Sequence, residues 1–406
     1  MSKEKRRVPK LRFPGFTEDW EPCEFNNLFK KNLEKNNGKF KSDKTISIAK
    51  MTFNELGNGA SEESLDNYKV LRIGDIAFEG HENKDFKFGR FVMNDIGNGI
   101  MSPRFTTLRP IELLELDFWK EYINYESIMQ KKLVHSTKKG TMMHELVVDE
   151  FLKQEILVPT EKEQQYIGRL LKFLSKVISL QQRKLEHLNL KKKALLQKLF
   201  PKEGARYPEL RFPGFTDAWE QRKLGDIATF SKGNGYSKSD LVPSGSPIIL
   251  YGRLYTNYET TIKNVDTFVK LKDKSVISHG GEVIVPASGE TAEDISRASV
   301  VKNQGIIIGG DLNVIKANHL LDPTFLSLTI SNGEQQKELS KRAQGKSVVH
   351  LHNSDLQEVN LLFPLLNEQK EISTLFEKMD NIITLHQRKL EHLQLQKKAL
   401  LQQMFV

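Results

Sequence analysis

Residues 9–21 read PKLRFPGFTEDWE, and residues 208–220 read PELRFPGFTDAWE, so the chain carries the same block twice. A second block, QRKLEHL, occupies residues 182–188 and returns at 387–393. The first pair is 208 − 9 = 199 residues apart, and the second pair is 387 − 182 = 205 residues apart. Between these blocks the two halves diverge almost completely. A chain with constant ends and variable interiors is expected to hold two equivalent modules that do one job on different targets.

The composition suits a globular protein of more than one domain. Its 406 residues suffice for two domains of about 150 residues each plus connecting elements. A formal net charge of +9 favours a polyanionic partner such as nucleic acid. The single cysteine, Cys23, excludes an internal disulfide and a cysteine-rich zinc site. Because the sequence has no secretory signal and no apolar run of about 20 residues, we predict a cytoplasmic protein that does not cross a membrane.

A long helix is predicted from Thr160 onward. Thr160 followed by Glu163 fits a capping box, in which the hydroxyl accepts a backbone N–H bond and the carboxylate reaches back to the cap. Apolar residues then recur at alternating steps of four and three, with Gln181 and Lys192 in the gaps, which is a heptad pattern. Pro201 ends it, and about 40 residues at about 1.5 Å each give a helix of about 60 Å. The seam of this helix includes Leu171, Leu174, Ile178, Leu185, Leu188 and Leu195.

The second half of the chain repeats this seam, with its gaps at His386 and Lys397. Two such helices in one chain predict an antiparallel coiled coil that relates the two modules by a pseudo-two-fold axis. The alternative is that each seam docks only on the core of its own domain. The second seam includes Phe376, Met379, Ile383, Leu390, Leu393 and Leu400.

The variable interiors are predicted to be mixed α/β modules, which makes the whole chain α+β with two long separating helices. Short β-rich runs are bounded by glycine turns. Gly74-Asp75-Ile76 in the first module and Gly281-Glu282-Val283 in the second both fit the start of a buried strand. The predicted boundaries are residues 1–159 for the first module, 160–203 for the first helix, 204–366 for the second module and 367–406 for the second helix.

Basic and aromatic residues in the modules are candidates for contact with a nucleic acid. Arginine can bond guanine with two hydrogen bonds, whereas lysine mainly neutralises phosphate. In the first module the candidates are Lys84, Lys87, Arg90, Arg104, Lys138 and Lys139. In the second module they are Lys232, Tyr236, Lys238, Arg253, Arg297, Arg342 and Lys346.

The sequence contains no motif for catalysis or metal binding that we recognise. Gly345-Lys346-Ser347 resembles the end of a phosphate-binding loop, but Ser340 stands where that loop requires glycine. The chain has no HExxH, no paired Cys-x-x-C, and no Pro-Pro or Pro-Asp dipeptide. Without Pro-Pro the chain lacks the motif of adenine-N6 methyltransferases, and without Pro-Asp it lacks the usual form of the common nuclease core. We therefore predict no catalytic and no metal-binding residue.

The order of these blocks resembles the specificity subunit of type I restriction-modification systems. Each module opens with LRFPGF-x3-W and leads into a QRKLEHL…KKALLQ helix, over essentially the whole chain. The resemblance implies that each module is a target recognition domain for one half of a bipartite double-stranded DNA sequence. It implies that the helices set the spacing of the halves and dock the other subunits.

The same resemblance implies partners that supply the chemistry. Two methyltransferase subunits would use S-adenosylmethionine to methylate adenine, and up to two restriction subunits would use ATP and Mg²⁺ to translocate and cut DNA. This chain would bind no cofactor itself and would not be an enzyme alone. The alternatives are a coiled-coil adaptor that binds only proteins and a self-contained DNA-modifying enzyme.

Overall fold

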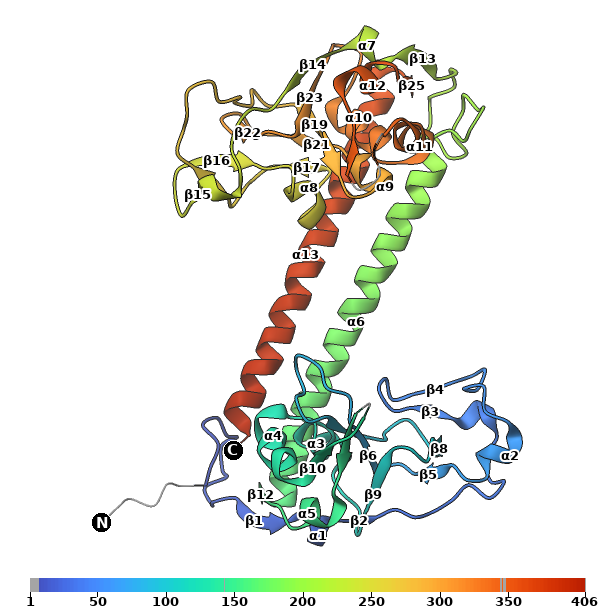
Figure 1. Ribbon diagram of the computed structural model, residues 1–406, viewed down its shortest axis with the longest axis vertical. Helices are drawn as coiled ribbons and strands as arrows, with labels where there is room; N and C mark the ends of the chain where they lie inside the picture. The colour runs from blue at the N-terminus through green and yellow to red at the C-terminus, as the bar shows by residue number, and fades with distance from the viewer. Residues whose placement is uncertain (1–6, 142, 344, 346–347, 406) are drawn as a thin grey trace. The chain divides into compact units, whose positions relative to one another are not determined.

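The computed structural model describes residues 7–141, 143–343, 345 and 348–405 (Figure 1). The chain divides into two compact units. Unit 1 contains Met1–Gln182 with Lys389–Val406, and unit 2 contains Arg183–Arg388. The two long helices, α6 (Glu161–Leu199) and α13 (Leu366–Met404), therefore each contribute one end to each unit. Within the described residues, no helix combines the length and apolarity needed to cross a membrane.

Unit 1 carries the first module. Its strands are β1 (Glu21–Glu24), β2 (Phe29–Lys31), β3 (Ile46–Ser47), β4 (Thr52–Phe53), β5 (Lys69–Leu71), β6 (Ile76–Glu79), β7 (Arg90–Met93), β8 (Gly99–Met101), β9 (Thr106–Pro110), β10 (Thr137–Lys139), β11 (His144–Leu146) and β12 (Glu155–Val158). Its shorter helices are α1 (Phe25–Leu28), the 3-10 helix η1 (Ser42–Lys44), α2 (Glu62–Leu65), α3 (Leu116–Tyr122), α4 (Glu126–Ser136) and α5 (Val148–Leu152).

Unit 2 carries the second module. Its strands are β13 (Glu220–Lys223), β14 (Ala228–Lys232), β15 (Leu241–Val242), β16 (Ser246–Ile249), β17 (Thr261–Ile262), β18 (Phe268–Val269), β19 (Glu282–Pro286), β20 (Ser288–Gly289), β21 (Ser299–Val301), β22 (Ile307–Ile308), β23 (Leu312–Ala317), β24 (Val349–His350) and β25 (Asn360–Phe363). Its shorter helices are α7 (Leu224–Ile227), the 3-10 helix η2 (Lys238–Asp240), α8 (Arg253–Thr256), α9 (Ala292–Ile295), α10 (Pro323–Ile330), α11 (Gly333–Arg342) and α12 (Asn353–Gln357).

The two modules share a central sheet. In unit 1 its order is β2-β9-β6-β7, and in unit 2 it is β14-β23-β19-β21 with β17 added in parallel at the edge. The predicted buried strands are confirmed, because every residue of β6 and of β19 is buried. The strand-opening carboxylates are buried as well, and they find different partners. Asp75 accepts hydrogen bonds from Arg109, whereas Glu282 accepts the backbone N–H groups of His279 and Gly280.

The sheets beyond this common core differ between the modules. Unit 1 has two separate two-stranded sheets, β3-β4 and β5-β8. Unit 2 has one four-stranded sheet in the order β15-β18-β16-β22, in which β16 and β22 are parallel. The sequence divergence between the blocks therefore appears as different outer strands on a common sheet.

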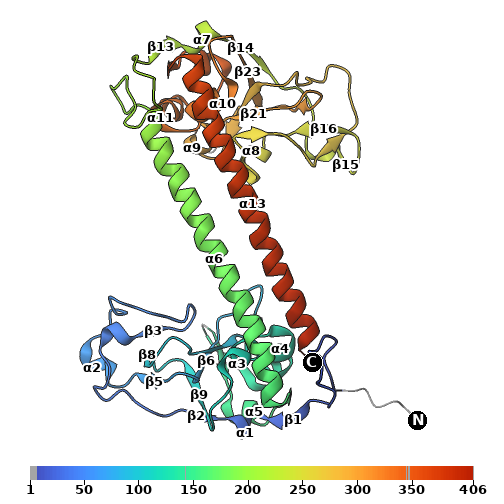
Figure 2. The same cartoon turned by 180° about the vertical axis from the view of Figure 1, so that it is seen from behind.

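Each core contains the beginning of one long helix and the end of the other. The core of unit 1 includes Ile167 near the start of α6 together with Met404 at the end of α13. The core of unit 2 includes Ile372 near the start of α13 together with Leu199 at the end of α6. Figure 2 shows the last turns of α13 beside α4, seen from behind. The predicted antiparallel coiled coil is confirmed, and the alternative that each seam docks only on its own domain is wrong.

All the predicted seam residues are buried or half-buried, as a heptad seam requires. The two lysines predicted in the gaps have carboxylate partners. Lys192 lies 2.5 Å from Asp380 of α13 within unit 2, and Lys397 lies 2.7 Å from Glu121 of α3 within unit 1. The gap positions thus bury their long side chains along the seam while their charges are neutralised locally.

Candidate nucleic-acid interface

The structure brings four of the six cationic candidates of the first module together. Lys84 and Lys87 lie in the connection between β6 and β7, and Lys138 and Lys139 lie on β10; all four are exposed. The β10–β11 hairpin is fastened to this connection, because the His144 N–H donates to the Gly80 carbonyl at 2.8 Å. A side chain at position 80 would clash with the His144 carbonyl.

The other two candidates of the first module lie elsewhere. Arg104 is exposed in the turn between β8 and β9. Arg90 is half-buried, and its guanidinium is engaged in the fold. It donates to the Ala49 carbonyl at 2.7 Å and to Glu79 at 3.4 Å, and it lies over the Phe86 ring at 5.2 Å. Arg90 therefore ties strand β7 to the segment that contains Ala49 and is engaged mainly within the fold.

In the second module, Lys232 and Lys238 are exposed on either side of a tight turn. Tyr236 lies between them in a left-handed conformation, with a φ of 60°. Its hydroxyl accepts the Lys272 N–H at 2.8 Å and lies 2.6 Å from the Ser275 hydroxyl, while the Lys272 ammonium lies 4.7 Å from its ring. Tyr236 thus fixes this turn and presents the two neighbouring lysines.

The three arginine candidates of the second module are paired with carboxylates of their own module. Arg253 contacts Glu259 at 2.8 Å and Asp266 at 3.0 Å, and its side chain is only 13% exposed. Arg297 lies 2.8 Å from Asp294, and Arg342 lies 2.9 Å from Glu338. The remaining candidate, Lys346, lies outside the described residues.

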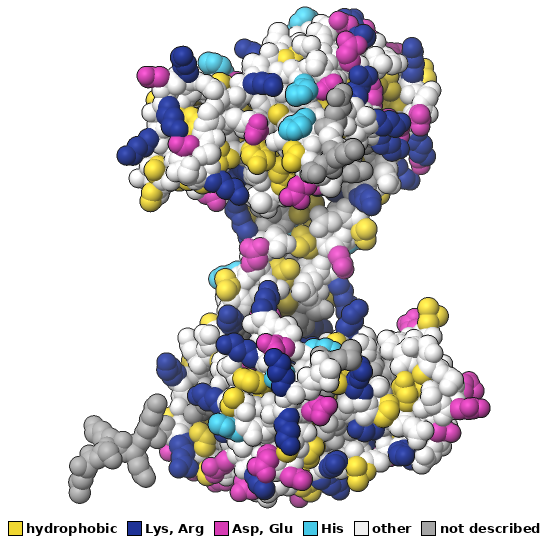
Figure 3. Space-filling view, viewed as in Figure 1, with side chains coloured by type: hydrophobic (Ala, Val, Ile, Leu, Met, Phe, Trp, Pro, Cys, Tyr) yellow, Lys and Arg dark blue, Asp and Glu magenta, His cyan; other side chains and the backbone are white. Residues whose placement is uncertain are grey.

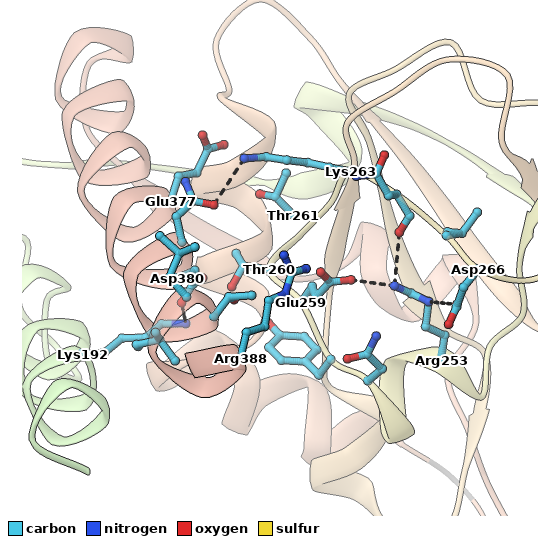
Figure 4. A pocket seen from close by; sticks show the side chains of 18 of the residues that line it. Lys192, Arg253, Glu259, Thr260, Thr261, Lys263, Asp266, Glu377, Asp380 and Arg388 are labelled. Carbon is cyan, nitrogen blue, oxygen red and sulfur yellow. Dashed lines mark hydrogen bonds and ion pairs between the residues drawn. The ribbon is translucent and has the colours of Figure 1, made fainter. Parts of the chain in front are cut away.

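A groove of about 750 Å³ in unit 2 runs between α13 and the segment 257–266 that contains β17 (Figure 4). Figure 4 shows Arg253 between Glu259 and Asp266, and Lys192 beside Asp380. Because acidic groups accompany the basic ones along its walls, this groove is poorly suited to a phosphate backbone. The exposed lysines outside it suit that task better, and Figure 3 shows Lys and Arg side chains over the visible face of both units.

The described residues contain no cluster of histidine, cysteine or carboxylate groups that could hold a metal ion.

Comparison with known proteins shows which family this arrangement resembles. Residues 216–395 match the family model described as type I restriction modification DNA specificity domain. The type I restriction enzyme MjaVIII specificity subunit of Methanocaldococcus jannaschii is 21% identical over 291 residues, covering 69% of this chain and 68% of that protein. The chain is similar to type I specificity subunits, and its second half matches their DNA specificity domain. The part of the chain that matches the family model holds the second module and most of the helix that follows it.

Solved structures show that the whole chain has the fold of a specificity subunit. The crystal structure of the type I specificity subunit from M. genitalium aligns with a TM-score of 0.64 at 13% identity, covering 98% of this chain and 99% of that one. A chain from a structural study of assembly and conformational transition in a type I restriction-modification system aligns with a TM-score of 0.52 at 17% identity, covering 97% and 98%. Specificity subunits are the non-catalytic components of these systems.

Sequence reasoning missed the ion pairs that join the modules of this chain to its long helices. Arg12 donates to Glu163 through Nε and Nη2, at 2.7 and 2.8 Å. Arg211 donates to Glu368 in the same way, at 2.8 and 2.7 Å. The predicted capping box is therefore only half correct. The Thr160 hydroxyl does accept a hydrogen bond from the Glu163 N–H at 3.4 Å. The Glu163 carboxylate, however, accepts hydrogen bonds from Arg12.

A signal for these pairs was present in the sequence. The arginine belongs to the repeated LRFPGF block, and a Glu-Gln dipeptide follows at 163–164 and at 368–369. The glutamine makes the same type of hydrogen bond in both units. Gln164 Nε2 donates to the Pro159 carbonyl at 3.0 Å, and Gln369 Nε2 donates to the Pro364 carbonyl at 2.8 Å. The arginine and the Glu-Gln dipeptide recur in both halves of the sequence, and the contacts that they make recur in both units.

Proposed function

We propose that this chain reads a bipartite DNA sequence, with one half read by each module, and that the two helices hold the halves at a fixed spacing. The observation that carries this is the division between constant and variable parts. The same central sheet and the same helix junctions occur in both units, while the outer strands differ. Two copies of a scaffold with different outer surfaces suit the recognition of two different short sequences.

The exposed cations supply the first contacts with DNA. Lys84, Lys87, Lys138 and Lys139 approach the first half-site, and Lys232 and Lys238 approach the second. Lysine neutralises phosphate and so sets the pose, while loops inserted in the major groove read base edges. Arg253, Arg297 and Arg342 act mainly by holding those loops, because each is already bound to a carboxylate of its own module.

The chemistry belongs to partner subunits. Two methyltransferase subunits, each with S-adenosylmethionine, bind the two equivalent helix junctions and methylate one adenine in each half-site, which is turned out of the duplex. Up to two restriction subunits with ATP and Mg²⁺ join them and cut DNA whose sites are unmethylated. The assembly acts in the cytoplasm, where the host DNA lies. The support for a pair of methyltransferases is that the same junction is built twice in one chain.

The test uses the complex with its methyltransferase. Binding is measured on a DNA that carries the bipartite target and on two DNAs in which one half-site is scrambled. We expect either scrambled half to reduce binding by at least about 10³-fold, a typical margin between specific and non-specific affinity. The paired variant Lys84→Ala, Lys87→Ala should weaken binding and lower its salt dependence. Equal binding to all three DNAs would instead support a protein-only adaptor.

A further inference from the structure

The repeated LRFPGF blocks touch both long helices. In unit 1, the Leu11 N–H donates to the Gln403 carbonyl in the last turn of α13 at 2.9 Å. The next residue, Arg12, forms its two hydrogen bonds with Glu163 in the first turn of α6. Two adjacent residues of the block therefore bind the end of one helix and the start of the other.

Unit 2 repeats this arrangement atom for atom. The Leu210 N–H donates to the Lys198 carbonyl in the last turn of α6 at 2.8 Å. Arg211 forms two hydrogen bonds with Glu368 in the first turn of α13. The roles of the two helices are exchanged, as a pseudo-two-fold relation requires. The block is constant because it serves the helices, which are constant as well.

These contacts are strong enough to fix the position of a helix end. The last carbonyls of a helix have no partner inside it, so the leucine N–H satisfies a group that would otherwise need water. The side chains of Glu163 and Glu368 are 0% and 1% exposed, and the two-bond geometry with arginine is the strong form of ion pair. The hydrogen bonds to Glu163 and Glu368 raise the pKa of Arg12 and Arg211.

Aromatic side chains close the same junctions from the inside. Phe405, which follows α13, lies 5.8 Å from Phe118 of α3. Phe200, which follows α6, lies 5.5 Å from Phe325 of α10 in a stacked arrangement. Each helix end is thus held by a backbone hydrogen bond and by an aromatic contact in the module core.

We propose that each LRFPGF block is a clasp whose arginine fixes the axial position of a module on the helix pair, and that the two clasps set the exact number of base pairs between the half-sites. This rests on the proposed function. A shift of one helical residue moves a module by about 1.5 Å and turns it by about 100°, whereas one base pair advances about 3.4 Å. The step of one base pair is therefore only about two helical residues long, and we expect a loosened clasp to let the modules settle on half-sites that are one base pair nearer or farther. Arg12 and Arg211 are positioning residues for spacer length.

The test compares methylation by the assembled complex on DNAs whose spacer is one base pair shorter than, equal to, or one base pair longer than the natural one. The double variant Arg12→Met, Glu163→Gln removes the clasp without leaving a lone buried charge. We expect methylation of the two altered spacers, relative to the natural one, to rise about tenfold or more. Arg211→Met, Glu368→Gln should do the same. Arg12→Lys keeps the charge but loses the planar guanidinium. Its methylation of the altered spacers should lie between that of the wild type and that of the double variant.

The matched control is Arg109→Met, Asp75→Asn. This pair also joins an arginine to a carboxylate that is 1% exposed, but it connects β9 with the start of β6 inside the central sheet of unit 1. It should lower stability without changing the spacer preference. If the clasp variants keep the wild-type spacer preference, or if the control relaxes it equally, the proposal is overturned.

A second measurement does not depend on DNA. Spin labels on Lys41→Cys and Ser239→Cys, two exposed positions in different units, are placed in a Cys23→Ser background with the methyltransferase bound. The distance distribution should broaden in the clasp variants and stay narrow in the control. If the wild-type complex methylates no bipartite site, the proposed function fails. In that case the distance measurement still tests whether the clasps anchor the modules. Broadened distributions in the clasp variants would support the anchoring, and unchanged distributions would overturn it.

Discussion

The two units are alike where each module joins the long helices, and they differ in the outer strands of the modules. At the junctions, the two units repeat the same contacts, from the Arg–Glu pair to the aromatic residue that follows each helix. In the outer strands, unit 1 has two small sheets and unit 2 has one sheet of four strands. The comparison teaches that duplication has preserved the parts that set geometry. The parts that differ are those that meet the DNA target in the proposed function.

The two modules also stabilise their variable parts differently. In unit 1, Glu34 accepts hydrogen bonds from Arg72, Arg109 and Lys39, and so joins the outer strand β5 to the central sheet. In unit 2, Arg253 occupies the centre of an ion-pair cluster and binds two carboxylates. One module thus has a half-buried acid at the centre of an ion-pair cluster, and the other has a half-buried base.

The largest expected effect concerns the shared core. Phe118→Ala and Phe325→Ala each remove a fully buried ring that packs against the aromatic residue after a long helix. Each should lower the free energy of unfolding by about 3–5 kcal/mol. Urea denaturation followed by tryptophan fluorescence measures this, with the exposed Leu113→Ala as control. A large loss of unfolding free energy for only one of the two variants would show that the two cores are not equivalent.

The acid cluster of unit 1 predicts a pH dependence. The hydrogen bonds from Arg72, opposed by burial and aided by Arg109, hold the pKa of Glu34 well below its usual range. Its contribution is then fully present above the unfolded pKa of about 4.3 and is lost as the pH falls through lower values. Glu34→Gln should cost about 1–3 kcal/mol at neutral pH and flatten the loss of stability in acid. Thermal melts between neutral pH and pH 3 check this, with the exposed Glu62→Gln as control.

A smaller effect is expected at the basic centre of unit 2. Arg253→Ala should lower the free energy of unfolding by about 1 kcal/mol, because both carboxylate partners are partly or largely exposed. It should weaken binding of the second half-site equally for all sequences, since the guanidinium positions a loop. Competition binding with single base changes in that half-site gives the readout. Relaxed preference at one base pair would show that Arg253 reads a base.

The smallest effects concern the lysines in the seam gaps. Lys192→Met and Lys397→Met should each change the free energy of unfolding by at most about 1 kcal/mol, as half-exposed ion pairs do. Double-mutant cycles with Asp380→Asn and Glu121→Gln measure the coupling in each unit. Coupling well above that size at one gap and not at the other would show that the two ends of the helix pair are unequal.

The sequence predicted the parts of the fold that depend on local or periodic patterns. The heptad spacing from Leu171 to Leu195 identified the helices, and the Gly-Asp-Ile and Gly-Glu-Val stretches located the central strands. It could not predict that Glu163 binds Arg12, because those residues are 151 positions apart and local rules offered a capping box instead. Repetition of both residues in the second half was the available clue.

Candidate DNA-contacting residues were harder to judge from sequence, because the residue type does not reveal its partner. Arg253 and Lys238 were equivalent candidates in the sequence. The fold then brings Asp266, 13 residues away, against Arg253 and leaves Lys238 exposed. Whether a basic side chain is free to meet phosphate depends on which carboxylates the tertiary structure places beside it.

The most direct test of the central claim is methylome sequencing of a host that expresses this chain with its methyltransferase. The account predicts adenine methylation in a split motif, with two short specific halves and a spacer of constant length. Exchange of residues 224–359 for the equivalent segment of a known specificity subunit should change one half of the motif and leave the other half and the spacer as they were. A continuous motif, no methylation, or a change in both halves would contradict the account.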